Sequence, residues 1–191
     1  MVESNNLRAF IPHQSSDRVI LITHPPRRKD RMPESEYYPV FIARYTLAIQ
    51  DPDTPGPRYH TGIFVATSSD GSGVLHQVTG DVTSPDGMVY TPTSEPAPQE
   101  SEVFYSIEEL GVTPAERYPG DWEEALRGIP PPPQQKAFNL QTMRTEPFKT
   151  RDPLVFYEPS EERRPLVKCT EWTLERALPA LKAEGLIVDI K

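Results

Sequence analysis

The chain has 191 residues, of which 36% are hydrophobic, and it carries a formal net charge of −8. This size and composition predict one compact domain with its own core, and no segment repeats at a fixed period. The acidic balance opposes binding to nucleic acid through bulk electrostatics, and no stretch approaches the roughly 18 apolar residues of a membrane span. A single cysteine excludes an internal disulfide, and no apolar leader follows Met1, so we expect a cytoplasmic protein.

The first part of the chain is predicted to be a polar arm over residues 1–17, followed by a single domain over residues 18–191. The apolar run at 18–23 is typical of a strand. A basic cluster at 27–31 is flanked by prolines, which indicates a solvated loop rather than a nucleic-acid site.

Strands are predicted at residues 38–49, 59–66 and 74–79, where β-branched and aromatic residues are enriched. Glycine and serine residues at 68–73 turn the chain between the last two, so these two strands form a β-hairpin. His60 lies on its first arm and His76 on its second.

Residues 82–165 contain many of the 23 prolines and are predicted to form a long proline-rich insertion or lid over one side of the domain. Within this segment we expect short strands at 88–90 and 153–157, a helix at 121–126 and a stiff polyproline spacer at 130–133.

The last helix is predicted to begin near Cys169. An apolar stripe of leucine and alanine runs from 174 to 181, Pro179 is expected to break or kink the helix, and Gly185 is expected to cap its C-terminus. Residues 186–190 then form a terminal strand or a docked tail.

Cys169 is the candidate nucleophile. A thiol in the first turn of a helix lies in the positive end of the helix dipole, and Lys168 beside it also favours the thiolate, so we expect a lowered pKa. The alternative is that a solitary free cysteine is simply a small buried hydrophobic residue. Cys169 lies off the apolar stripe of its helix, which favours a site over packing.

The hairpin sequence His60-x-Gly62-Ile63-Phe64-Val65, the later His76 and the helix start Lys168-Cys169-Thr170-Glu171-Trp172 resemble a known superfamily. They are similar to the circularly permuted branch of the NlpC-type papain-like fold, which includes the lecithin:retinol acyltransferase-like proteins, and to a group of small fungal proteins of that fold. The order histidine, histidine, cysteine matches the permuted arrangement. The resemblance covers about residues 59–81 and 166–188. It implies an α+β, papain-like domain with a central antiparallel sheet and a helix that carries the nucleophile.

The resemblance implies that Cys169 attacks an acyl carbon, that His60 takes and returns the proton, and that His76 orients the imidazole. A thiol nucleophile needs the same three roles on chemical grounds. Two positions depart from the family pattern, because Thr61 stands where tryptophan is common and Lys168 where asparagine is common.

The two histidines can share a face of the hairpin only if paired positions add to an even number. Gln77 would point to the opposite face from His76 and is the alternative orienting residue. Trp172 is a candidate wall of the binding site, although tryptophan there more commonly packs in the core. Glu171 is expected on a solvated helix face.

Two functions remain open from the sequence. The first is a thiol-dependent hydrolase or acyltransferase that acts through a covalent thioester on an amide, ester or thioester of a small molecule or peptide. The second is a catalytically inactive papain-like module that binds a protein or small molecule. Neither function requires a cofactor, and the scattered histidines, including His13 and His24, lack the spacing of a metal site.

Overall fold

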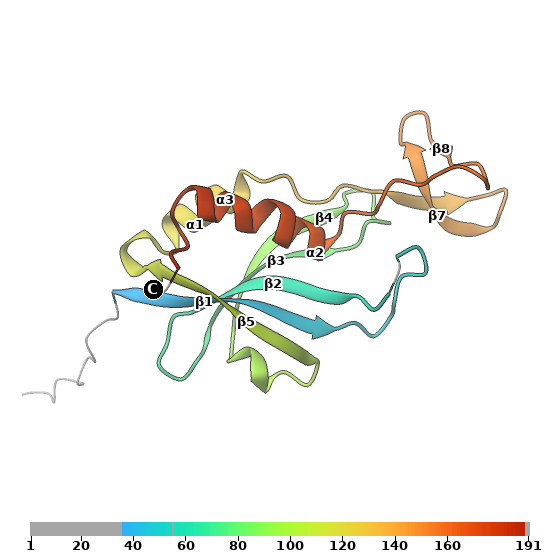
Figure 1. Cartoon of the computed structure of the whole chain (residues 1–191). Helices are drawn as coiled ribbons and strands as arrows, with labels where there is room; N and C mark the ends of the chain where they lie inside the picture. The colour runs from blue at the N-terminus through green and yellow to red at the C-terminus, as the bar shows by residue number, and fades with distance from the viewer. Residues whose placement is uncertain (1–35, 55, 190–191) are drawn as a thin grey trace, which may run out of the picture. The chain divides into compact units, whose positions relative to one another are not determined.

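The computed structural model describes residues 36–54 and 56–189. The predicted polar arm, the strand at 18–23, the basic cluster at 27–31, His13 and His24 lie outside these residues. The described chain is an α+β domain in which every strand pairing is antiparallel (Figure 1).

The central sheet has five strands in the order β4–β3–β2–β1–β5. Their bounds are β1 (Tyr37–Thr46), β2 (Tyr59–Ala66), β3 (Gly73–Gly80), β4 (Met88–Glu95) and β5 (Phe104–Pro114). The predicted strands at 38–49, 59–66 and 74–79 correspond to β1, β2 and β3. Because β4 and β5 are opposite edges of the sheet, the link between them must cross one face, and it carries the short 3₁₀ helix η1 (Pro98–Glu100).

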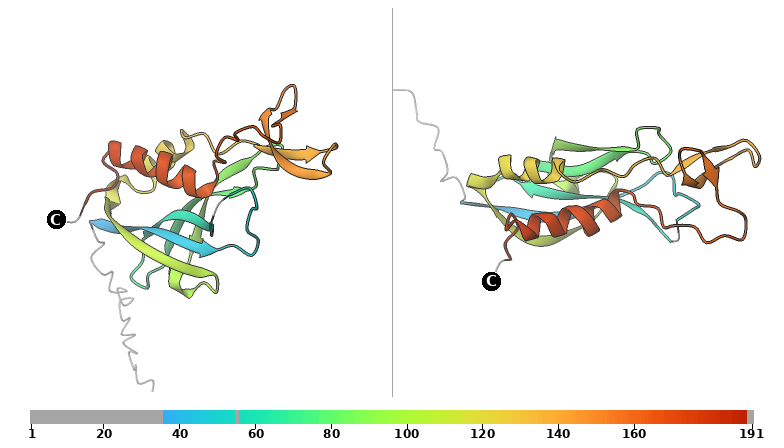
Figure 2. Two further views of the ribbon diagram at one scale, coloured as in Figure 1. Left: turned by 45° about the vertical axis from the view of Figure 1, so that its right-hand side comes forward. Right: turned by 90° about the horizontal axis from the view of Figure 1, so that it is seen from above.

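The helices lie on the other face of the central sheet, as both views in Figure 2 show. They are the 3₁₀ turn η2 (Ala115–Arg117), α1 (Gly120–Arg127), α2 (Cys169–Trp172), η3 (Thr173–Ala177) and α3 (Leu178–Ala183). The main core fills the space between them and the sheet and includes the fully buried Trp122, Trp172 and Leu181. A smaller cluster around Phe64 and Leu75 lies on the opposite face, where the β4–β5 link runs.

The last helix continues through Pro179 instead of breaking there. The segment η3 is a turn of π-helix, and Pro179 falls in the first turn of α3. Proline lacks an N–H, and the wider turn before it relieves the clash that its ring would make in a regular helix. Gly185 ends the helix in the left-handed conformation with φ of 66°, and the Leu186 N–H donates to the Leu181 carbonyl at 2.9 Å, as a helix C-cap requires.

The segment 82–165 is not one lid, contrary to the sequence-based prediction. Strands β4 and β5 belong to the central sheet, and Trp122 and Leu126 of α1 belong to its core. Only the later part forms a separate three-stranded sheet, β6 (Lys136–Asn139), β7 (Arg144–Thr150) and β8 (Val155–Phe156). The polyproline run before it packs against β4, where the Met88 N–H donates to the Pro132 carbonyl at 2.8 Å.

The C-terminal tail is docked by Gly111. Val112 and Val188 exchange two backbone hydrogen bonds of 2.9 Å, and a Cβ at position 111 would lie 2.3 Å from the Val188 carbonyl oxygen. Gly111 also has a φ of 136°, which side chains rarely adopt.

Gly111→Ala should therefore destabilise the protein, by about 1–3 kcal/mol, through backbone strain and loss of this pairing. Urea unfolding measures the loss. Gly120→Ala is the matched control, because a Cβ there meets nothing within 4 Å and its φ is not positive. Equal stability of the two variants would contradict the role of Gly111.

Candidate functional site

The site forms where β2 and β3 separate. The two strands pair from Ile63–His76 to Ala66–Gly73, but no pairing joins them over the first residues of β2. The start of the Cys169 helix takes the place of the missing partner. The Thr170 hydroxyl donates to the Tyr59 carbonyl at 3.2 Å, and the Thr173 hydroxyl donates to the Thr61 carbonyl at 3.1 Å. Side-chain hydroxyls thus satisfy backbone groups that the sheet leaves open.

Cys169 lies at this junction and is 8% exposed. Its thiol donates to the Tyr59 carbonyl at 3.8 Å. Burial raises the pKa of the thiol, but interactions with His60, Thr61 and Thr170 together lower it by more, so the net pKa lies below its ordinary value.

His60 shows the complementary balance. Burial lowers the pKa of the imidazole, whereas the interactions with Cys169 raise it, with further contributions from Gln77 and the charge of Glu95, and the net pKa lies above its ordinary value. The two shifts have one cause, since each group stabilises the charged form of the other. The arrangement therefore makes proton transfer from the Cys169 thiol to the His60 imidazole easier than it is between the isolated groups.

Gln77 holds the His60 ring. Its side-chain oxygen lies 2.5 Å from His60 Nε2, and its amide nitrogen donates to the Thr93 hydroxyl at 3.2 Å. Because an amide oxygen only accepts, the Nε2 nitrogen must carry the proton, which leaves Nδ1 as the ring nitrogen that can accept another.

His76 does not orient His60. Ile63 pairs with His76, so paired positions add to an odd number and the two histidines point to opposite faces of the hairpin. Instead, His76 Nδ1 lies 2.7 Å from the Tyr90 hydroxyl and Nε2 lies 2.9 Å from the Tyr118 hydroxyl. The face condition stated from the sequence thus selects Gln77, and His76 belongs to a polar network in the core beside Trp122.

Two other residues differ from expectation. Trp172 is fully buried, packs near Tyr90 with ring centroids 5.9 Å apart, and does not line the pocket at Cys169. Glu171 is not a solvated residue, because its carboxylate forms an ion pair with Arg58 at 2.6 Å and accepts a hydrogen bond from the Lys168 N–H at 2.9 Å. Glu171 thereby caps the start of the helix that carries the thiol.

A pocket of about 530 Å³ opens onto Cys169 and His60. The loop between β1 and β2 forms one wall with Leu47, Ile49 and Pro52. The turn after β3 and the start of β4 form another with Val82 and Met88. Ile49 is 85% exposed although it is apolar, so this rim offers apolar surface to a ligand.

Five charged side chains fix the β1–β2 loop beside the pocket, and we call them the Asp51–Asp53 clasp. Lys136 pairs with Asp51 at 2.9 Å and with Asp53 at 2.7 Å, Lys168 pairs with Asp51, and Arg163 pairs with Asp53 at 3.1 Å. Burial opposes ionisation of Asp51, but its interactions with Lys168, the Asp53 N–H and Lys136 together outweigh this and lower the pKa to about 2. Lys168 is evident from the sequence as a neighbour of the thiol, but the ion pairs of the clasp are not, because their members are far apart in the chain.

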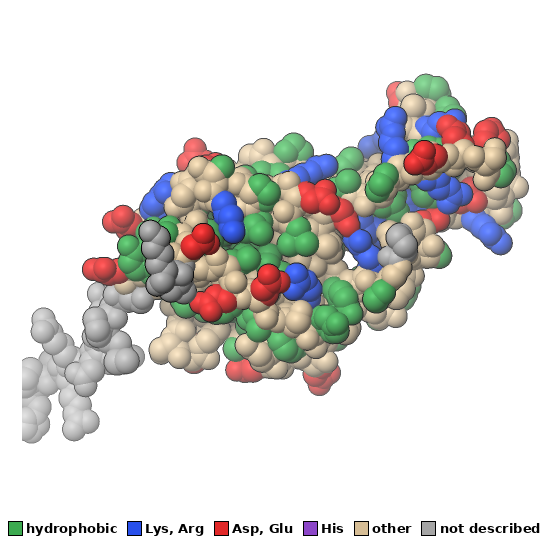
Figure 3. Space-filling model, in the orientation of Figure 1, with side chains coloured by type: hydrophobic (Ala, Val, Ile, Leu, Met, Phe, Trp, Pro, Cys, Tyr) green, Lys and Arg blue, Asp and Glu red, His purple; other side chains and the backbone are tan. Residues whose placement is uncertain are grey.

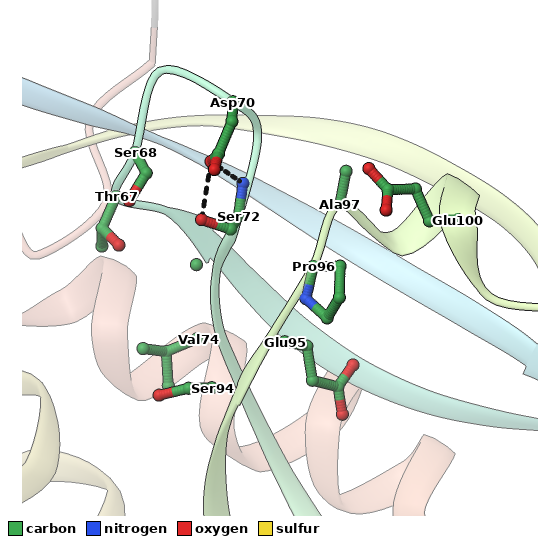
Figure 4. Close-up of a pocket in the computed structure, with 11 residues that line it drawn as sticks. Thr67, Ser68, Asp70, Ser72, Val74, Ser94, Glu95, Pro96, Ala97 and Glu100 are labelled. Carbon is green, nitrogen blue, oxygen red and sulfur yellow. Dashed lines mark hydrogen bonds between the residues drawn. The ribbon is translucent and has the colours of Figure 1, made fainter.

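A second pocket of about 470 Å³ lies at the β2–β3 turn and the end of β4 (Figure 4). Acidic and hydroxyl side chains line it, and the Asp70 carboxylate accepts from both the backbone and the hydroxyl of Ser72. It contains no thiol or imidazole, so the Cys169 pocket is the candidate functional site.

Within residues 36–54 and 56–189, histidine, cysteine and acidic side chains form no group of three that could hold a metal ion. No helix in the same part of the chain has the length and apolar character needed to cross a membrane. On the face drawn in Figure 3, basic side chains over the three-stranded sheet are interspersed with acidic ones.

The fold and site define an α+β domain in which a buried cysteine at the start of a helix lies beside a half-buried histidine on strand β2. The chain belongs to a family described as "Family of unknown function (DUF6540)", whose model matches residues 46–188. Comparisons with curated proteins and with solved structures gave no significant match.

The neutral core histidine predicts a loss of stability in mild acid. Burial lowers the pKa of His76 from 6.5 to about 4. Below pH 6.5 the His76 side chain therefore binds a proton in the unfolded chain but stays neutral in the folded protein. The free energy of unfolding should be fully retained above pH 6.5 and should fall by about 3 kcal/mol as the pH drops to about 4. Urea unfolding at several pH values measures this slope. His76→Gln should remove it between about pH 6.5 and 5, before carboxylates titrate; an unchanged slope would show that another group is responsible.

Proposed function

We propose that this protein is a thiol-dependent hydrolase or acyltransferase that acts through a covalent thioester on an amide, ester or thioester substrate. The observation that carries the proposal is the pairing of a Cys169 thiol of lowered pKa with a His60 imidazole of raised pKa at the floor of an open pocket. A structural cysteine has no need of a base, an orienting residue and access to a ligand at the same place.

In the proposed reaction His60 accepts the thiol proton at Nδ1, and the Cys169 thiolate attacks the acyl carbon. The new carbon–sulfur bond replaces the bond to the amine, alcohol or thiol, which leaves with the proton from His60. Water or another acceptor then attacks the thioester, gives its proton back to His60 and releases the thiolate. Gln77 keeps the imidazole in the required tautomer throughout.

The oxyanion that forms during attack needs hydrogen-bond donors. The backbone N–H of Cys169 begins the helix and is the first donor that we propose. The helix start also favours negative charge, because its first N–H groups have no partner within the helix.

A papain-like fold of the permuted type is part of this proposal. The central antiparallel sheet, the chain order histidine before cysteine, and a nucleophile at the start of a helix packed on the histidine strand support it. A role for Gln77 in place of the second histidine is the main departure from the resemblance. The proline-rich excursion borders the pocket through Val82 and Met88 and, in the separate β6–β8 sheet, through Lys136 and Thr145.

The alternative proposal is a catalytically inactive module that binds a small molecule or protein in the same pocket. The low exposure of Cys169 and its membership of the main core favour it. Thiol reactivity in the folded protein separates the two proposals, since a purely structural thiol reacts only after unfolding.

The pH dependence of Cys169 alkylation by iodoacetamide, followed by intact mass, tests the proposed pair. The folded protein should show one labelling event with an apparent pKa below the ordinary value of about 8.5, and His60→Ala should raise that pKa. His76→Gln is the control and should leave the profile in place, because His76 contacts the core tyrosines. Labelling only after denaturation, or a rate indifferent to His60, would support the binding module instead.

The role of Gln77 can be tested in the same assay. Gln77→Leu should slow alkylation near neutral pH roughly tenfold, because His60 loses the acceptor that fixes its tautomer. Gln77→Glu retains an acceptor and should preserve the reactivity. Thr79→Val is a matched control, since the Thr79 hydroxyl pairs with Thr91 on the same strands and contacts neither reacting group. If Gln77→Leu reacted as fast as the control, Gln77 would have only a packing role.

A further inference from the structure

The Asp51–Asp53 clasp carries an excess of positive charge beside the nucleophile. Three cations, Lys136, Arg163 and Lys168, share only two carboxylates. The nearby Arg58 is neutralised separately by Glu171, which contacts it through both carboxylate oxygens. One positive charge of the clasp is therefore uncompensated.

Lys168 is the member of the clasp that can present this charge to a ligand. Its side chain is 20% exposed, whereas that of Lys136 is 6% exposed and is held between two aspartates. Lys168 lines the pocket, directly precedes Cys169 in the chain, and pairs with one oxygen of Asp51. An ammonium group has three N–H donors, so it can bind a second acceptor without leaving Asp51.

The opposing charge in the pocket is Asp81. It lies on the turn after β3, and its carboxylate accepts the Thr83 N–H at 2.7 Å. Asp81 and Lys168 would therefore impose opposite preferences on the charge of a ligand near Cys169. We expect Lys168 to set the charge preference, because it adjoins the nucleophile in the chain, whereas Asp81 lies on a different wall of the pocket.

We propose that the substrate carries an anionic group, a carboxylate or a phosphate ester, close to the acyl carbon, and that Lys168 is the residue that selects it. This inference rests on the proposed function, since it concerns the same pocket and nucleophile. The apolar rim at Leu47 and Ile49 would then contact the part of the substrate beyond the anionic group.

Charged thiol reagents test this preference without knowledge of the substrate. Three methanethiosulfonates of different charge serve as probes: the anionic sulfonatoethyl, the cationic trimethylammonium-ethyl and the neutral methyl reagent. Each forms a disulfide with Cys169 and releases a sulfinate. The rate constants of the anionic and cationic reagents are divided by those for free cysteine at the same pH. After this normalisation, the anionic reagent should be favoured roughly three- to thirtyfold at low salt, and less at high salt.

Two variants should move this preference in opposite directions. Lys168→Met should bring the normalised ratio close to one. Asp51→Asn removes the carboxylate partner of Lys168, while Lys136 keeps Asp53, and should raise the ratio. The neutral reagent corrects for any change in the pKa of Cys169, because such a change affects all three reagents alike. Arg127→Met removes a positive charge from an exposed pair with Glu123, outside the pocket lining, and serves as the charge-matched control.

The outcomes separate this inference from the proposed function. Failure of all three reagents to modify the folded protein would overturn the proposed function, and this inference with it. Modification without a charge preference, or with a cationic preference, would overturn the inference alone and, in the second case, assign the selecting charge to Asp81. A preference that Lys168→Met and Arg127→Met reduce equally would reflect net charge and would also overturn it.

Discussion

The separation of β2 from β3 is the constraint on which the rest of the site depends. A continuous ladder would place the carbonyls of Tyr59 and Thr61 against β3 and leave no room for a helix start. Because the ladder ends at Ile63, two threonine hydroxyls of the last helix donate hydrogen bonds to these carbonyls, and the helix begins beside His60. Gly62 lies at this point, where a Cβ would come within 3.0 Å of the His76 carbonyl. Close packing thus brings the thiol and the imidazole together.

The electrostatics of the site follow from this placement. Burial alone would keep both Cys169 and His60 neutral, yet their mutual interaction shifts each toward its charged form. The Asp51–Asp53 clasp acts at longer range and ties three segments to the pocket: the β1–β2 loop, the first strand of the small sheet and the residues before the last helix. Buried ion pairs of this kind add little net stability, but they fix geometry, which a pocket between loops otherwise lacks.

The predictable parts of the fold are those with local signals. Strands β2 and β3 have β-branched runs and a glycine-rich turn, and Gly185 marks the helix end where a left-handed residue is needed. The strand β5 is not predicted from the sequence, although it is the longest strand in the described part of the chain. It is an edge strand with mostly partly exposed residues, and its Ile-Glu-Glu-Leu segment, from Ile107 to Leu110, has no strand-like alternation. Its pairing with β1 decides its structure, and that contact is not local in sequence.

The sequence by itself determined which residues are candidates for the site, their order along the chain and the two candidates on β3 for orienting His60. Only the tertiary structure decided between them, because a shift of one residue in strand register moves every side chain to the other face. The observed register places Gln77 on the face of His60 and leaves His76 in the core with Tyr90 and Tyr118. The arrangement of charges around the thiol likewise could not be predicted from the sequence, since Lys136 and Asp51 come into contact only when the chain folds.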